Sequence, residues 1–136
     1  MSIERAAVVG AVIVVEGQVL AARRTRPADL AGYWEFPGGK VEVGEDPRVA
    51  LVREIREEPA ATVIVADEIT GDDGPWIISE KYVLRLFLAT VVSGSLVPGP
   101  DHDEIRWLDG ASLEAVDWLP SDRAALGAVR GALRSI

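Results

Sequence analysis

The segment from Gly39 to Ala61 restricts what this chain can fold into more than any other feature. It reads GKVEVGEDPRVALVREIREEPAA and contains Glu54, Glu57 and Glu58 at the spacing i, i+3, i+4. On a helix, which turns by ~100° per residue, these three carboxylates share an arc of roughly 100°. Carboxylates ~6 Å apart repel each other by roughly 3 kcal/mol per pair at an effective dielectric constant near 20. We therefore expect either a solvated helix face or a cation site, and all-oxygen ligands favour Mg²⁺ or Mn²⁺.

The residues before these glutamates indicate a loop that leads into a capped helix. Gly38 and Gly39 predict a tight bend, and Asp46 followed by Pro47 is typical of a helix start. We expect a loop, a helix over Pro47–Glu58 and a second loop.

This segment resembles the signature of the Nudix hydrolases. That signature is a glycine, five residues, Glu, seven residues, Arg-Glu, an aliphatic residue, any residue, Glu-Glu, any residue, glycine and an aliphatic residue. The residues in register are Gly39, Glu45, Arg53, Glu54, Ile55, Glu57 and Glu58. Ala60 and Ala61 replace the last glycine and the closing aliphatic residue, and Pro59 disfavours helical geometry at the residue before it. We expect the helix to end differently from the family norm and metal binding to be weaker.

Hydrophobic patterning along the chain predicts a mixed sheet covered by helices, which is an α+β fold. We expect strands at Ala6–Val15, Val19–Arg24, Thr62–Thr70, Lys81–Val92 and Glu104–Leu108, a second helix over Ser121–Leu133 and a short helical turn at Ala111–Ala115. The resemblance implies a Nudix α/β/α sandwich, with the mixed β-sheet between helices and a loop-helix-loop metal site. Its 136 residues suit one domain, 1–136.

Composition excludes several functional classes. The absence of cysteine excludes disulfides and zinc sites built on sulfur, and the formal charge of −8 disfavours binding to duplex nucleic acid. The apolar run Ala6–Val15 is too short to span a bilayer, so we expect a cytoplasmic protein with no membrane contact. It would act as a monomer or a homodimer.

The text YWEFPGGKVE, residues 33 to 42, resembles the MutT-type branch of the family, which hydrolyses nucleoside triphosphates. The resemblance implies that the carbonyl of Gly38 joins Glu54, Glu57 and Glu58 around a metal ion. Asp101, from a loop, would be a further ligand or base, although PGPDHDE would be an ordinary polar turn in any protein. Glu54 is also a candidate base.

Other polar residues are candidates for support of the loop or for binding of the substrate. Glu45 and Arg53 are expected to brace the loop by pairing with each other and with neighbouring backbone. Arg24 and Lys40 would hold the outer phosphates, or would be ordinary surface charges. The resemblance implies that Asp122 touches the nucleobase, and an acceptor there suits the exocyclic amine of cytosine; the alternative is a helix cap.

The lone histidine, His102, lies in the same loop as Asp101. A lone loop histidine is more often a surface residue than a catalytic base. We expect His102 to be a surface residue.

The resemblance implies a Mg²⁺-dependent nucleoside triphosphate pyrophosphohydrolase that releases a nucleoside monophosphate and pyrophosphate. The small-molecule substrates we expect are cytosine nucleotides, namely CTP, dCTP and 5-methyl-dCTP. One alternative is 8-oxo-dGTP, whose N7–H also satisfies an acceptor. Another is ADP-ribose, on the basis of Pro75 beyond the signature, and a third is a Nudix module that binds a nucleotide without hydrolysing it.

Overall fold

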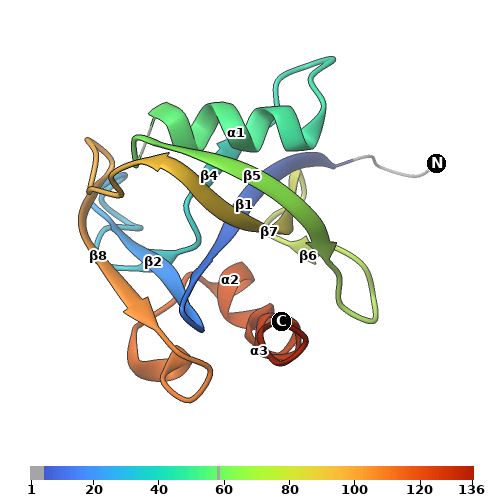
Figure 1. The fold of residues 1–136 in the computed structure, drawn as a ribbon. Helices are drawn as coiled ribbons and strands as arrows, with labels where there is room; N and C mark the ends of the chain where they lie inside the picture. Colours follow the sequence, from blue (N-terminus) through green and yellow to red (C-terminus); the bar gives the residue numbers. More distant parts are fainter. Residues whose placement is uncertain (1–4, 58) are drawn as a thin grey trace.

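The computed structural model describes residues 5–57 and 59–136, which form an eight-stranded mixed sheet with helices on both faces (Figure 1). The strands are β1 (Ala6–Val15), β2 (Gln18–Arg24), β3 (Trp34–Glu35), β4 (Gly38–Lys40), β5 (Ala61–Ile69), β6 (Trp76–Ile77), β7 (Tyr82–Gly94) and β8 (His102–Leu108). The helices are α1 (Pro47–Glu57), α2 (Pro120–Ala124) and α3 (Leu126–Arg134), with one turn of 3₁₀ helix at Leu113–Ala115.

The long predicted strands and the first helix are confirmed to within a few residues. Three short strands, β3, β4 and β6, were not predicted. The expected helix over Ser121–Leu133 is divided into α2 and α3 at Ala125, whose N–H donates to the carbonyl of Asp122 at 3.0 Å instead of continuing the regular helical pattern.

The sheet is mixed because β1 lies between strands of both directions. It runs parallel to β7, from the pair Ala6 and Tyr82 to the pair Ile13 and Ala89. It is antiparallel to β2 and to β4. β5 continues the sheet beyond β7, and β8 pairs with β2.

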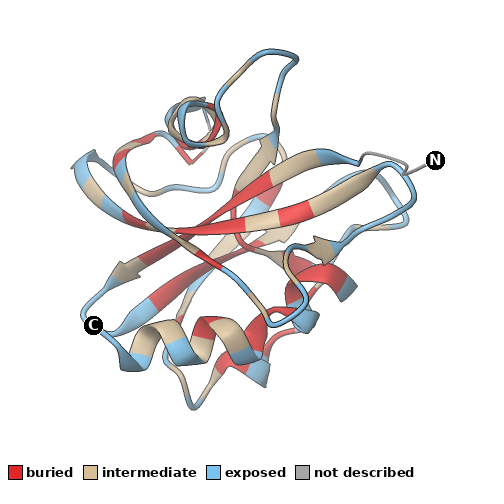
Figure 2. Ribbon diagram, turned by 90° about the vertical axis from the view of Figure 1, so that its right-hand side faces the viewer, coloured by how far each residue is buried: buried red, intermediate tan, exposed pale blue. Residues whose placement is uncertain are grey.

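Burial along β1 explains the layers. Val9, Ala11 and Ile13 belong to the core beneath α1, whereas Val12 belongs to the core on the side of α3. This alternation follows from the two-residue period of a strand. In Figure 1 the sheet separates α1 from α2 and α3, and in Figure 2 the buried residues are concentrated along the strands. The predicted α/β/α sandwich is confirmed.

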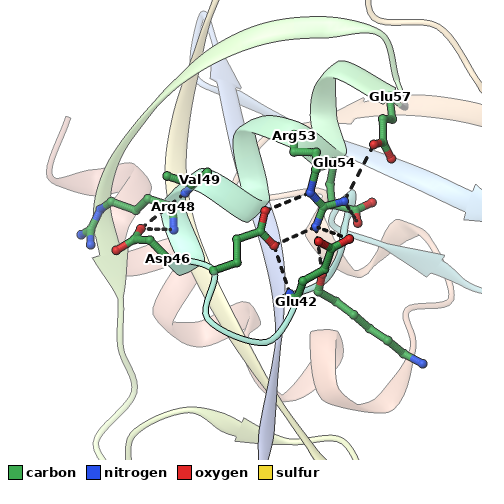
Figure 3. A network of polar contacts seen from close by, with 9 residues as sticks. Glu42, Asp46, Arg48, Val49, Arg53, Glu54 and Glu57 are labelled. Atoms are coloured by element: carbon green, nitrogen blue, oxygen red, sulfur yellow. Dashed lines mark hydrogen bonds and ion pairs between the residues drawn. The ribbon is translucent and has the colours of Figure 1, made fainter.

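The start of α1 is capped as its sequence predicts. The Asp46 side-chain Oδ1 accepts hydrogen bonds from the backbone N–H groups of Arg48, at 2.8 Å, and Val49, at 3.4 Å (Figure 3). The Ala50 N–H donates to the Asp46 carbonyl at 2.9 Å, which closes the first turn. The helix therefore begins at Pro47, where a missing N–H costs nothing.

Beyond its last turn, α1 is followed by a residue in the left-handed region. Ala60 has φ of 75°, and its N–H donates to the Ile55 carbonyl at 2.9 Å. The position of the expected glycine thus keeps a positive φ although alanine occupies it. Glu58, a predicted metal ligand, lies outside the described residues.

Ala60→Gly is expected to raise the free energy of unfolding by roughly 0.5–1 kcal/mol, because glycine has no Cβ to be strained at a positive φ. The greater conformational entropy of glycine in the unfolded chain offsets part of this gain. Urea titration followed by circular dichroism measures this. Ala66→Gly is the matched control, since Ala66 is also exposed but has no positive φ. That variant should lose stability, and equal changes in the two variants would contradict the argument.

None of the helices in the described part of the chain is both long enough and apolar enough to span a membrane.

Candidate active site

Arg53 and Glu45 form a two-point ion pair between α1 and the loop before it. The Arg53 Nε and Nη2 atoms donate to the two carboxylate oxygens of Glu45 at 3.0 and 2.9 Å. Arg53 Nη2 also donates to the Lys40 carbonyl at 3.3 Å, and the Glu42 N–H donates to Glu45 at 3.0 Å. The expected pairing is present, and the hydrogen bonds from Arg53 and Glu42 lower the pKa of Glu45.

The same guanidinium contacts two signature glutamates of α1 (Figure 3). Its Nη1 donates to Glu54 at 2.9 Å and lies 3.8 Å from a Glu57 oxygen. Burial nevertheless raises the pKa of Glu54, and this outweighs the opposing influence of Arg53. The Glu54 carboxylate is thus partly stripped of water and only partly compensated, which suits a proton acceptor or a cation ligand.

Gly38 and Gly39 are part of strand β4, so the predicted tight bend is wrong. They pair with Gly10 and Val9 of β1. A Cβ on Gly38 would lie 1.8 Å from the Val9 carbonyl oxygen, and one on Gly39 would lie 2.4 Å from Cδ of Glu54. Glycine is required because neighbouring groups approach closely, not because the chain turns.

A cavity of about 470 Å³ brings most of the predicted site residues together. Those that line it are Arg24, Gly38, Lys40, Glu54, Asp101 and Asp122. Glu45, Arg53 and Glu57 lie outside its lining. Pro75 lines a different cavity, of about 700 Å³, so the residue that suggested ADP-ribose is not in the wall that contains Glu54.

The candidate metal ligands differ in how they are held. Glu54 and Glu57 both contact Arg53, and Asp101 forms an ion pair with Arg26. Within residues 5–57 and 59–136, no three acidic, histidine or cysteine side chains gather as a metal-binding group. The donors are all oxygen, however, and a divalent cation would offset the burial that penalises the charge of Glu54, so the donor chemistry fits Mg²⁺ or Mn²⁺.

Asp122 is buried and does not cap its helix. The residue at the cap position of α2 is Leu119, and no side chain caps the helix, so the capping alternative is wrong. The Phe36 N–H donates to Oδ2 of Asp122 at 3.0 Å, and the Ser121 hydroxyl donates to Oδ1 at 3.3 Å. Burial, with the nearby charge of Glu35, raises the pKa of Asp122 to about 7 despite these hydrogen bonds.

Asp122→Asn is expected to remove part of the pH dependence of stability. The folded pKa of about 7 exceeds the usual 3.8, so the folded protein keeps a proton that the unfolded chain releases as pH rises. The free energy of unfolding of the wild type therefore falls by about 2 kcal/mol through this group between pH 5 and 7. Urea titrations at pH 5 and pH 7 should show that the free energy of unfolding of Asp122→Asn, relative to that of the wild type, rises by about 2 kcal/mol between the two pH values. A relative stability that is the same at both pH values would contradict the prediction.

Two residues near the cavity differ from expectation, because His102 is buried and Glu35 was not among the predicted site residues. His102, expected at the surface, is 8% exposed. Its Nε2 donates to Oε2 of Glu35 at 2.8 Å, and Nη1 of Arg24 donates to the same oxygen at 2.8 Å. Glu35 also lines the cavity. The sequence feature that could have indicated Glu35 is its position as a single charged residue between two aromatic residues, Trp34 and Phe36.

Comparison with known proteins adds an independent line of argument. Residues 4–129 match the NUDIX domain. A Mycobacterium tuberculosis protein provisionally named 8-oxo-dGTP diphosphatase 2 is 41% identical over 119 residues, which cover 85% of this chain and 82% of that protein. The CTP pyrophosphohydrolase of Escherichia coli is 48% identical over 64 residues, 47% of each chain. The solution structure of the E. coli ORF135 protein superposes with a TM-score of 0.78 at 32% identity, over 98% of this chain and 93% of that chain.

Proposed function

The chain belongs to the Nudix family of hydrolases, and we propose that it is a Mg²⁺-dependent pyrophosphohydrolase that cleaves cytosine nucleoside triphosphates to the monophosphate and pyrophosphate. The observation that carries the proposal is that one cavity is lined both by Glu54, a signature carboxylate, and by Asp122, a buried acid. Glu54 can act at the phosphates of the substrate, and Asp122 can contact its base.

The signature residues act on the phosphates. Gly38, through its carbonyl, and Glu54, Glu57, Glu58 and Asp101 would hold the metal. When bound, a divalent cation neutralises phosphate charge and makes a water molecule more acidic. Glu54 takes up the proton of the attacking water, for which its raised pKa suits it, and Arg53 fixes its orientation.

Lys40 lines the cavity, with its ammonium 4.9 Å from the centre of the Tyr82 ring, and this supports a role in binding phosphate. Arg24 already donates to Glu35 and to the Arg26 carbonyl, so it shapes the cavity wall and has fewer donors left for phosphate. Lys40 therefore provides the principal phosphate contact from the cavity wall.

Asp122 supports cytosine as the base. A carboxylic acid with a pKa near 7 can accept from the N4 amino group of cytosine and donate to its N3. The E. coli relative named for CTP agrees with this assignment. The second candidate is 8-oxo-dGTP, favoured by the M. tuberculosis relative and by an N7–H that an acceptor also recognises.

The test is hydrolysis of CTP, dCTP, 5-methyl-dCTP, 8-oxo-dGTP and ADP-ribose with Mg²⁺, resolved by ion-exchange chromatography. The proposal expects a cytosine triphosphate to give the monophosphate and pyrophosphate with the highest kcat/KM. Preference for 8-oxo-dGTP would support the second candidate, and cleavage of ADP-ribose alone would overturn both. Binding without turnover across the panel would identify a non-catalytic nucleotide-binding module.

A further inference from the structure

We propose that the outer edge of β5, together with the groove between β5 and α1, is the interface of a homodimer. In this dimer the β5 strands of two copies of the chain pair antiparallel about a two-fold axis. The surface lies outside the cavity that contains Glu54 and Asp122, and the inference does not depend on which nucleotide the enzyme hydrolyses.

Strand β5 has a neighbour on one side only. It is the last strand of the sheet path, whose order is β3-β2-β1-β7-β5 (Figure 1). Among residues 5–57 and 59–136, the backbone of β5 forms hydrogen bonds only with β7. The N–H and C=O groups along its outer side are therefore open to a further strand, and strand addition at such an edge is a common mode of association.

The two halves of β5 differ in how well they can accept another strand. Between the pairs Val65–Ala89 and Glu68–Phe87, β5 has one residue more than β7. Such a bulge, with the charges beside it, disfavours pairing along the second half. The segment Ala61–Val65 contains neither a charge nor a proline, and its one irregularity adds the extra residue to β7 instead. We therefore place the pairing at Ala61–Val65.

Apolar side chains surround this segment on the surface. Ile64 of β5 and Val49 of α1 are each 60% exposed. A groove of about 460 Å³ runs between α1 and β5, and its apolar lining consists of Val49, Val52, Val63, Ile64 and Val65. Apolar surface that is continuous in this way is typical of a protein–protein contact.

The charges of the groove require an acidic partner. Its other lining residues are Arg48, Arg53 and Arg56, and no acidic residue of the described chain lines it. Arg56 is exposed and forms neither an ion pair nor a hydrogen bond with another described residue. Asp67 of β5 is likewise exposed and has no such partner in the same part of the chain. The chain thus carries one unpaired cation and one unpaired anion beside this edge.

These two charges lie at opposite ends of β5, because α1 and β5 run in opposite directions. Arg48, at the start of α1, has its guanidinium 4.9 Å from the centre of the Phe87 ring, and Phe87 pairs with Glu68 near the end of β5. Arg56, near the end of α1, precedes the first residue of β5 by five residues. Arg56 therefore lies at the beginning of β5 and Asp67 near its end.

A two-fold axis normal to the sheet makes the charges complementary. Antiparallel pairing of the two Ala61–Val65 segments places the end of one β5 that carries Asp67 beside the Arg56 end of the other. Symmetry forms this pair twice, as in any isologous interface. The same axis keeps both α1 helices on one face of the continuous sheet and brings the two grooves together. A second copy thus supplies the strand, the apolar side chains and the acids that the groove lacks.

Sedimentation velocity of the full chain over a dilution series tests the dimer. The wild type should show twice the chain mass of 14.6 kDa and dissociate on dilution. Ile64→Lys should raise the dissociation constant by about 100-fold or more, because it places a charge at the centre of the interface. Ile77→Lys is the matched control, since Ile77 of β6 is 61% exposed but lies away from β5, and it should leave the dissociation constant unchanged.

A charge exchange tests the orientation of the two strands. Arg56→Glu and Asp67→Arg should each raise the dissociation constant by about 10-fold or more, because each variant forms two pairs of like charge across the interface. The double variant restores both pairs with the signs reversed, so it should dimerise nearly as well as the wild type. Circular dichroism of every variant verifies that the fold is kept.

Each contrary outcome overturns a defined part of the inference. A wild type that is monomeric at every concentration would exclude a second copy as the occupant and leave the edge to a strand of another protein. A dimer that Ile64→Lys does not weaken would place the interface elsewhere. A double variant as weak as the single variants would exclude antiparallel pairing of β5. A dimer without hydrolytic activity would contradict the proposed function and leave this inference intact.

Discussion

Glu54→Gln and Glu57→Gln should each lower kcat by about 1000-fold or more while the protein remains folded. Glutamine keeps the size of the side chain but removes the negative charge that holds a cation and, at Glu54, the group that accepts a proton. The Arg53 contact to Glu54 can persist, because an amide oxygen also accepts a hydrogen bond. Steady-state rates of pyrophosphate release with saturating Mg²⁺ measure the effect.

The control for this pair is Glu80→Gln, an exposed glutamate outside the site. It should retain wild-type kcat, and all three variants should unfold at temperatures close to that of the wild type. Near-normal turnover of both Glu54→Gln and Glu57→Gln would overturn the assignment of the metal site. A loss confined to Glu54→Gln would favour Glu54 as the base and remove Glu57 from the ligands.

The sequence was most informative where contacts are local. Glu45 and Arg53 lie eight residues apart in one loop and the helix that follows it, and their expected pairing is present. Asp46 and Pro47 likewise set the start of α1 through bonds to the next turn. The long strands were predictable because their apolar pattern extends over many residues.

Contacts between distant residues explain what the sequence did not reveal. Glu35 is hydrogen-bonded to His102 across 67 residues of chain, and the Phe36 N–H donates to Asp122 across 86. In both pairs, the residues around one partner in the sequence give no indication of the other partner. The strands β3 and β6 have two residues each, too few for any periodicity. A pair of glycines is equally compatible with a bend and with a strand packed against a neighbouring carbonyl, so β4 could not be predicted from Gly38 and Gly39.

The two glycines have different close neighbours, namely the Val9 backbone for Gly38 and the Glu54 side chain for Gly39. Alanine at Gly38 should therefore affect mainly stability, and alanine at Gly39 mainly turnover. In Gly38→Ala the new Cβ would lie 1.8 Å from the Val9 carbonyl oxygen, which is backbone of the central strand and cannot move without breaking the β1 and β4 pairing. We expect a loss of about 3 kcal/mol or more in the free energy of unfolding. Urea titration measures it, and Gly127→Ala, with open space around the added Cβ and a helical position, should gain about 1 kcal/mol.

In Gly39→Ala the new Cβ instead meets the Glu54 carboxylate at 2.4 Å, and that side chain can swing away. The loss of stability should stay below about 1.5 kcal/mol, but the displaced carboxylate should lower kcat by roughly 100-fold, the usual effect of moving a reacting group by about 1 Å. Wild-type kcat in a folded Gly39→Ala protein would mean that the position of Glu54 beside β4 does not matter for turnover. A loss in kcat without a matching loss of stability would tie the glycine of the signature to the placement of its glutamate, because the three atoms nearest to the added Cβ all belong to the Glu54 carboxylate.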